Sequence, residues 1–105
     1  MKPIAPEKRR VQNAYNCIGK KWCISIICDI FSGRKRFTEF LESNPGLSTK
    51  MLAQRLAEMQ KSGLVRKKYN SATSGHDYVL TGKGLRAEKT LLEMAQFSAN
   101  ALEKS

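Results

Sequence analysis

The chain has no long apolar run. No segment of its 105 residues approaches the roughly 18 consecutive apolar residues that a membrane-spanning helix needs. The first six residues contain two prolines and no apolar stretch of the kind found in signal peptides. We therefore expect a cytoplasmic protein without membrane contact, in which residues 1–6 form a flexible arm and residues 7–105 form a single domain.

Residue types suited to catalysis and metal binding are scarce. The chain has one histidine and three cysteines, with no C-x-x-C pair, no glycine-rich phosphate loop and no evident pair of carboxylates. These absences exclude a disulfide scaffold and a zinc site, and they leave an enzyme without candidate catalytic residues or cofactors. Cys23 and Cys28 lie in an apolar segment, where we expect small buried side chains. Cys17, which Lys20 and Lys21 follow, is the best candidate for a reactive thiol.

Acidic residues are few, and the charge is uneven. Lys and Arg number 19 against 9 Asp and Glu, which gives a net charge of +10. Residues 1–70 hold 15 basic and 5 acidic side chains, whereas residues 71–105 hold 4 of each. This division indicates a module that faces a polyanion beside a neutral structural element. The alternative is general solubilising charge.

The segment 47–65 is the most informative part of the chain. Ser48 is suited to cap a helix, and Gly63 is suited to the left-handed position just after its end. One face of this helix is apolar and carries Leu52, Leu56 and Met59. The opposite face carries Thr49, Lys50, Ala53, Gln54 and Ala57. That face is small, polar and free of acid before Glu58, as a helix in a DNA major groove requires. The alternative is an ordinary amphipathic surface helix.

Turn residues and apolar spacing divide the rest of the chain into short elements. We expect further helices over residues 7–18, 21–31, 37–43 and 82–102, and strands over residues 64–69 and 77–80. The 21–31 segment is rich in β-branched residues, which would also suit a strand, but its length and flanking glycines favour a helix. Residues 37–62 then read as a helix-turn-helix, and the two strands with the polar loop 70–75 read as a β-hairpin wing. The predicted fold class is mainly α with a small β-hairpin, a winged helix-turn-helix.

The last predicted helix, 82–102, is long for so small a domain, at about 30 Å for 1.5 Å per residue. Its apolar stripe contains Leu85, Leu92, Ala95, Ala99 and Leu102. A short chain buries only a modest core, so we expect part of this stripe to meet a second chain.

An ordered set of short motifs runs from Cys17 to Leu102. The motifs occupy residues 18–22, 29, 33, 36–40, 45–56, 63–65 and 77–84. In this order and spacing they resemble the HxlR-type, MarR-like winged helix-turn-helix transcriptional regulators. The resemblance implies a cytoplasmic homodimer on pseudo-palindromic operators, with the first and last helices at the dimer contact. The candidate dimer residues are then Val11, Tyr15, Leu85, Leu92, Ala95, Ala99 and Leu102.

The chain departs from that family pattern at three places. Arg9 stands, by spacing back from Trp22, where many members have a redox-sensing cysteine, so sensing through that thiol is excluded. Cys28 stands where members often have an arginine before Asp29, so we expect a local ion pair to be missing. The wing lacks the family's prolines, which predicts a more mobile hairpin.

Candidate DNA contacts fall into two groups. We expect Thr49, Lys50 and Gln54 to read base edges, because Gln pairs with adenine and Lys reaches guanine acceptors. We expect the basic turn before residue 37, the helix cap and the wing strand to contact backbone phosphates. Arg55 is equally suited to contact a phosphate or to pair with Glu58 or Glu39. The predicted phosphate contacts are Arg34, Lys35, Arg36, Ser48, Arg55, Lys67 and Lys68. His76 is interpreted as a hairpin residue without a special role, the alternative being a pH-sensitive phosphate contact.

Two functions remain open from the residues. The first is a sequence-specific transcriptional regulator that binds double-stranded DNA as a homodimer. The second is a non-specific architectural or RNA-associated protein with the same fold. The specificity ratio separates them, because a regulator prefers its site over random DNA by about 10³ or more. The sequence names neither the operator nor a small-molecule effector.

Overall fold

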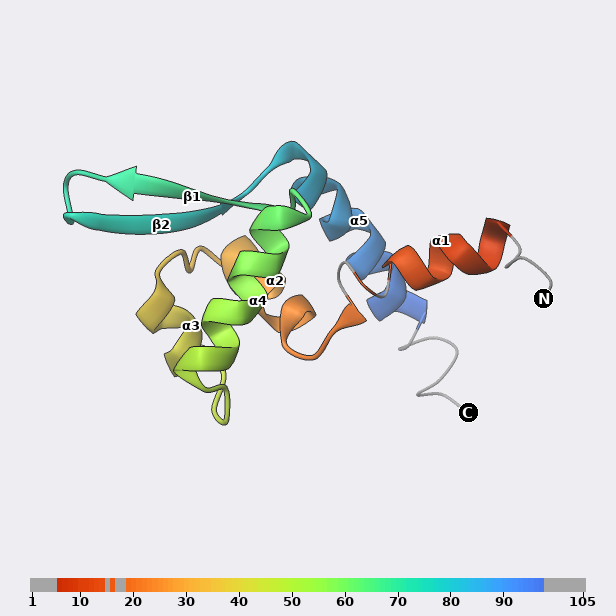
Figure 1. Cartoon of the computed structure of the whole chain (residues 1–105), viewed down its shortest axis with the longest axis horizontal. Coiled ribbons are helices and arrows are strands. Elements are labelled where there is room, and N and C mark those ends of the chain that lie inside the picture. Colours follow the sequence, from red (N-terminus) through yellow and green to blue (C-terminus); the bar gives the residue numbers. More distant parts are fainter. Residues whose placement is uncertain (1–5, 15, 17–18, 98–105) are drawn as a thin grey trace.

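The computed structural model describes residues 6–14, 16 and 19–97 and contains five helices and one hairpin within them. The elements in chain order are α1 (Pro6–Ala14), α2 (Cys23–Phe31), α3 (Phe37–Ser43), α4 (Thr49–Lys61), β1 (Val65–Asn70), β2 (Gly75–Leu80) and α5 (Gly82–Phe97). Figure 1 shows the hairpin reaching out on one side of α4, with α5 and α1 on the other side. The predicted winged helix-turn-helix, mainly α with a β-hairpin, is confirmed.

Element boundaries differ from the predicted ones for local reasons. Pro6 belongs to α1 and not to the arm, because proline is tolerated in the first turn of a helix. The backbone of Trp22 has a φ of 80°, so α2 begins at Cys23, two residues late. Asn70 and Gly75 pair in the β-ladder, which needs only backbone groups, so the polar turn shrinks to residues 71–74.

The hydrophobic core lies where α2, α3 and α4 meet the base of the hairpin. Its fully buried side chains are Cys23, Ile26, Ile27, Phe40, Leu52, Leu56 and Met59. The ring of Phe40 meets that of Tyr78 edge to face, with centroids 6.1 Å apart. The expectation that Cys28 is buried is wrong: its side chain is exposed. The reason is that α2 is covered on one side only, which also leaves Ile24 39% exposed.

A buried polar network joins α2 to the end of α3. The carboxylate of Asp29 accepts hydrogen bonds from Ser43 Oγ and Asn44 Nδ2, each at 2.8 Å. Asn44 also donates to the Phe40 carbonyl at 2.7 Å and accepts from Ser25 Oγ. Arg34 Nη1 lies 3.8 Å from Asp29 Oδ1, so Asp29 has a cationic partner, and the expectation that Cys28 leaves this region without an ion pair is wrong. This network fixes the angle between the two helices that support the turn before α4.

The start of α5 is tied to the junction between α4 and β1. Thr81 Oγ1 donates to the Gly63 carbonyl and accepts from the backbone N–H of Gly84 at 3.1 Å, so Thr81 caps the start of α5. A Cβ at Gly84 would overlap the Leu64 carbonyl oxygen. This contact lets the first turn of α5 lie directly on the chain entering the hairpin.

Candidate nucleic-acid interface

The exposed face of α4 is the first component of the interface. Ser48 Oγ accepts a hydrogen bond from the Met51 N–H at 3.0 Å, which confirms the predicted cap. Because Leu52, Leu56 and Met59 are buried, the helix turns its other side to solvent. The exposed residues of that side are Thr49, Lys50, Ala53, Gln54 and Ala57. None of them is acidic, so the face can approach DNA without a repelling carboxylate.

A cluster of polar and charged side chains surrounds Glu58, beside the C-terminal end of this face of α4. Glu58 accepts hydrogen bonds from Gln54 Nε2 at 3.3 Å and Arg55 Nη1 at 3.2 Å, and Lys20 Nζ lies 3.4 Å away. Burial raises the pKa of Glu58, but the hydrogen bonds from Gln54 and Lys20 and the charges of Lys20 and Arg55 outweigh it and lower that pKa. The predicted base reader Gln54 is therefore held by an internal acceptor in the free protein.

Arg55 takes the internal one of its two predicted roles. Its Nε donates to the Lys21 carbonyl at 2.9 Å, and its side chain is only 13% exposed. The guanidinium thus joins α4 to the segment before α2 and does not point outward to a phosphate. Of the two predicted internal partners, Arg55 pairs with Glu58. The sequence could not exclude the phosphate role, because the contact with Lys21 that holds the guanidinium depends on the tertiary fold.

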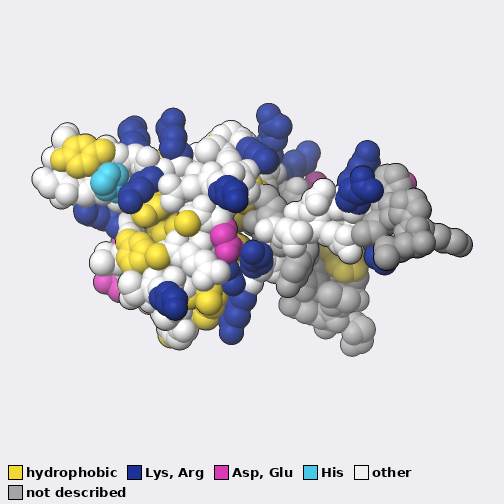
Figure 2. All heavy atoms as spheres, in the orientation of Figure 1, with side chains coloured by type: hydrophobic (Ala, Val, Ile, Leu, Met, Phe, Trp, Pro, Cys, Tyr) yellow, Lys and Arg dark blue, Asp and Glu magenta, His cyan; other side chains and the backbone are white. Residues whose placement is uncertain are grey.

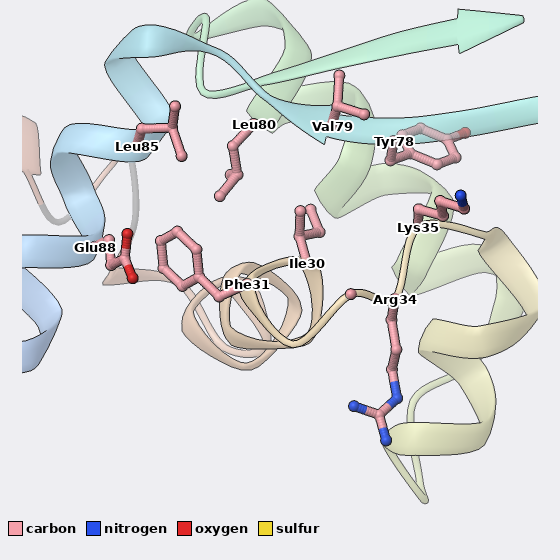
Figure 3. A pocket seen from close by; sticks show the side chains of 10 residues that line it. Ile30, Phe31, Arg34, Lys35, Tyr78, Val79, Leu80, Leu85 and Glu88 are labelled. Atoms are coloured by element: carbon pink, nitrogen blue, oxygen red, sulfur yellow. The ribbon is translucent and has the colours of Figure 1, made fainter.

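The basic turn 34–36 holds the hairpin against α3. The Lys35 carbonyl accepts from the Tyr78 N–H at 2.7 Å, so this turn pairs with β2. Glu39 Oε1 accepts from the backbone N–H groups of Lys35 at 3.2 Å and Arg36 at 3.0 Å. Arg34 is engaged with Asp29, whereas Lys35 extends from the turn in Figure 3.

The register of the hairpin sends the two predicted wing lysines to opposite faces. Lys67 pairs with Tyr78, and Lys68 pairs with Asp77. The Lys67 ammonium lies 6.0 Å above the ring of Tyr78, on the face toward α3. Lys68 shares the other face with Asp77, whose carboxylate accepts from Asn70 Nδ2 at 3.1 Å.

A groove of about 480 Å³ separates the hairpin from α3 and α4, and we call it the wing groove. Its lining residues are Arg36, Phe37, Thr38, Ala53, Lys67, His76 and Tyr78. Ala53 belongs to the exposed face of α4, so groove and face are continuous. The groove was not predicted, and the two interpretations of His76 could not be decided, because both the groove and the place of His76 depend on the strand register.

A second hollow, of about 430 Å³, lies between the end of α2, β2 and α5. Figure 3 shows Ile30, Phe31 and Leu80 converging on it, with Glu88 of α5 beside Phe31. Arg34 points away from its centre in the same view. The lining of the hollow is mainly apolar, and its two cations, Arg34 and Lys35, belong to the basic turn already described.

The described part of α5 exposes large apolar side chains. Leu85 is 53% exposed, Leu92 59%, Met94 53% and Phe97 61%. Leu85 and Leu92 were predicted to contact a second chain, whereas Met94 and Phe97 were missed because they lie off the predicted stripe. The side chains of Val11 and Ala95 are not described, and Tyr15, Cys17, Ala99 and Leu102 lie outside the described residues.

On the face shown in Figure 2, Lys and Arg side chains lie along the hairpin and over the helices, and acidic side chains are fewer. Within the described residues, no group of His, Cys, Asp and Glu is arranged to hold a metal ion. Nor does any helix there have the length and apolarity to cross a membrane.

Comparison with known proteins shows which family has this sequence pattern. The profile of the HxlR-like helix-turn-helix family matches residues 17–105. YodB of Bacillus subtilis, an HTH-type transcriptional regulator, is 35% identical over 86 residues, which cover 81% of this chain and 77% of YodB.

Two solved structures of transcriptional regulators are similar to this chain over nearly its whole length. A protein described as a transcriptional regulator of the MarR family, from Enterococcus faecalis, aligns with a TM-score of 0.84 at 26% identity, over 98% of this chain and 94% of that one. The reduced form of YodB aligns with a TM-score of 0.81 at 30% identity, over 98% and 99%. The chain therefore belongs to the HxlR-like helix-turn-helix family and is a sequence-specific DNA-binding transcriptional regulator with a MarR-like winged-helix fold, not an enzyme.

Proposed function

We propose that the protein binds pseudo-palindromic operators as a homodimer, with α4 in the major groove and the hairpin on the DNA backbone. One observation carries this proposal: the exposed, acid-free face of α4 runs into the cationic wing groove. A duplex that meets this face brings its backbone to the hairpin. Because the chromosome is its target, the protein works in the cytoplasm.

The side chains divide between base reading and phosphate binding. Thr49, Lys50 and Gln54 contact base edges, and Gln54 exchanges Glu58 for an adenine. The capped start of α4, with Ser48, binds phosphate through its backbone N–H groups. The proposed backbone contacts are Lys35, Arg36, Lys67 and Lys68. Arg34 and Arg55 contribute less, because each already has a carboxylate partner.

The dimer contact is built on α5, the last described helix of the single domain that begins with α1 at Pro6. Leu85 and Leu92, seven residues apart, share one side of α5, whereas Met94 and Phe97 share another. A helix that is apolar on several sides belongs inside an assembly. Figure 1 places α1 at the same end of the molecule as α5, so it can extend this contact.

The specificity ratio tests the proposed function. The preferred duplex is selected from a random pool, and its affinity is compared with that of a scrambled duplex at one salt concentration. We expect a preference of about 10³ or more. Nearly equal affinities would instead support a non-specific architectural protein.

Sedimentation of the intact chain tests the dimer. We expect the mass of two chains at micromolar concentration, and a single chain for the double substitution Leu92→Glu, Phe97→Glu. Gln96→Glu adds the same charge to an exposed polar position of α5 and should leave the dimer intact. A stable, folded monomer of the unaltered protein would refute this arrangement.

A further inference from the structure

The wing groove gathers three side chains that can carry positive charge. Arg36 comes from the turn before α3, Lys67 from β1 and His76 from β2, and no carboxylate lines the groove. The hydroxyl groups of Thr38 and Tyr78 belong to the same lining. The groove therefore offers several donors and no competing anion.

The hairpin register places His76 in this group. His76 pairs with Tyr69, and the two rings meet edge to face with centroids 5.5 Å apart. His76 lies two residues from Tyr78 on the same strand, so its side chain shares the face that carries Lys67. Figure 2 shows the histidine beside Lys or Arg side chains at the edge of the hairpin.

The Arg36 guanidinium reaches the same end of β2. A Cβ added to Gly75, the neighbour of His76, would lie 2.6 Å from Arg36 Nη2. The guanidinium thus lies against the backbone at Gly75, where glycine leaves room for it. Arg36 and His76 both line the groove, one from the turn before α3 and the other from β2.

The carboxylates closest in sequence to the groove residues, Glu39 and Asp77, face elsewhere. Glu39 holds the backbone N–H groups of Lys35 and Arg36. Asp77 follows His76 but points to the other face of the hairpin, where Asn70 donates to it. From α4 the groove receives only Ala53, which is uncharged. The groove around His76 therefore has positive charge but no carboxylate to balance it, and an anionic ligand would fit there.

We propose that the wing groove is a binding site for one phosphate of the DNA backbone, and that His76 donates to it as an imidazolium. This inference rests on the proposed function, because Ala53 joins the groove to the face of α4 that meets DNA. Binding then takes up a proton at His76, since the negative phosphate favours the charged ring. The affinity for DNA consequently falls as the pH rises through the range in which histidine titrates, about 5 to 8.

The sole histidine makes a direct test possible. The untagged full chain gives one imidazole signal in NMR spectra, and its titration is recorded alone, with the selected duplex and with inorganic phosphate at the same phosphate concentration. We expect the duplex to move the titration midpoint to higher pH. An unchanged midpoint in the complex would overturn the proposal, and an equal change with inorganic phosphate would overturn the assignment to DNA.

Affinity measurements at pH 6 and pH 8 add a second test. The unaltered protein should lose about threefold to fivefold in affinity per subunit over this range, the value of one exposed charge pair. His76→Gln should bind at pH 6 as weakly as the unaltered protein binds at pH 8, whereas His76→Arg should bind tightly at both. Lys68→Gln, on the other face of the hairpin, removes a charge but should keep the pH dependence.

The results of these affinity measurements distinguish a failure of the phosphate site from a failure of the proposed function. Specific binding at pH 8 in the unaltered protein supports the function whatever His76 does. If His76→Gln then keeps the full pH dependence, the phosphate site is refuted and the function stands. If no duplex is preferred at either pH, both are refuted.

Discussion

Gln54 must leave Glu58 before it can read a base. Its hydrogen bond at 3.3 Å is long and exposed, so little is lost when DNA replaces it. We expect Gln54→Ala to cost about 1–3 kcal/mol on the selected duplex and little on a scrambled one. Lys35→Ala, which removes a proposed phosphate contact, should weaken binding to both duplexes alike.

Titrations of both duplexes check this expectation. Gln60→Ala is the matched control, because Gln60 is a glutamine of the same helix that donates to the Leu56 carbonyl and lies outside the proposed interface. If Gln54→Ala leaves the ratio of the two affinities unchanged, Gln54 is not a base reader.

The ionisation of a single side chain, Glu58, makes the free energy of unfolding depend on pH. Its pKa is lowered in the folded protein, so its ionised form stabilises the fold above the usual glutamate value near 4.5. This contribution is lost as the pH falls through the lowered value. Glu58→Gln should therefore cost up to about 1 kcal/mol of unfolding free energy at pH 7, as for exposed ion pairs, and almost nothing at pH 3.

Urea unfolding at the two pH values measures that difference. Glu42→Gln serves as a control, because Glu42 is an exposed glutamate for which the structure shows no ion pair. A cost of Glu58→Gln that is the same at pH 3 and pH 7 would show that the carboxylate charge is not the cause.

At the scale of elements, two nearby glycines of α5 should respond in opposite ways. Gly84→Ala places a Cβ on the Leu64 carbonyl oxygen, and we expect it to cost about 1–3 kcal/mol through overpacking. A Cβ at Gly82 meets nothing within 4 Å, so Gly82→Ala should be neutral or stabilise by up to about 1 kcal/mol. Thermal unfolding of both variants checks this, and equal effects would contradict the close approach.

The elements were largely predictable from local rules, whereas the site was predictable only in part. Ser48, Gly63 and Thr81 act locally, and their roles as cap or terminator follow from a few neighbouring residues. The exposure of Cys28 depends on which side of α2 is covered, and the internal role of Arg55 depends on Lys21, 34 positions away. Such contacts between distant segments leave no local pattern.

At the scale of the whole molecule, the dependence of affinity on salt reports the extent of the interface. With Arg34 and Arg55 engaged internally, about three to five cations per subunit remain for phosphates, or about six to ten per dimer. Counterion release then predicts a slope of log K against log salt between about −5 and −9. A slope near −2, measured on the selected duplex, would mean that few of these cations contact phosphates and that most of the positive charge lies outside the DNA interface.

Thr81 alone joins β2 to α5, and the Lys35 carbonyl holds β2 at Tyr78, so the hairpin, α3 and the start of α5 turn together as one body. Six residues per strand give the hairpin a length of roughly 20 Å, so a rotation of that body by about 10° moves the tip by roughly 3.5 Å. The start of α5 cannot turn freely, because Gly84 lies on Leu64. In the proposed dimer, a small change in the angle between the two α5 helices would thus be amplified at both hairpin tips, and the spacing of the operator half-sites would be determined far from any base.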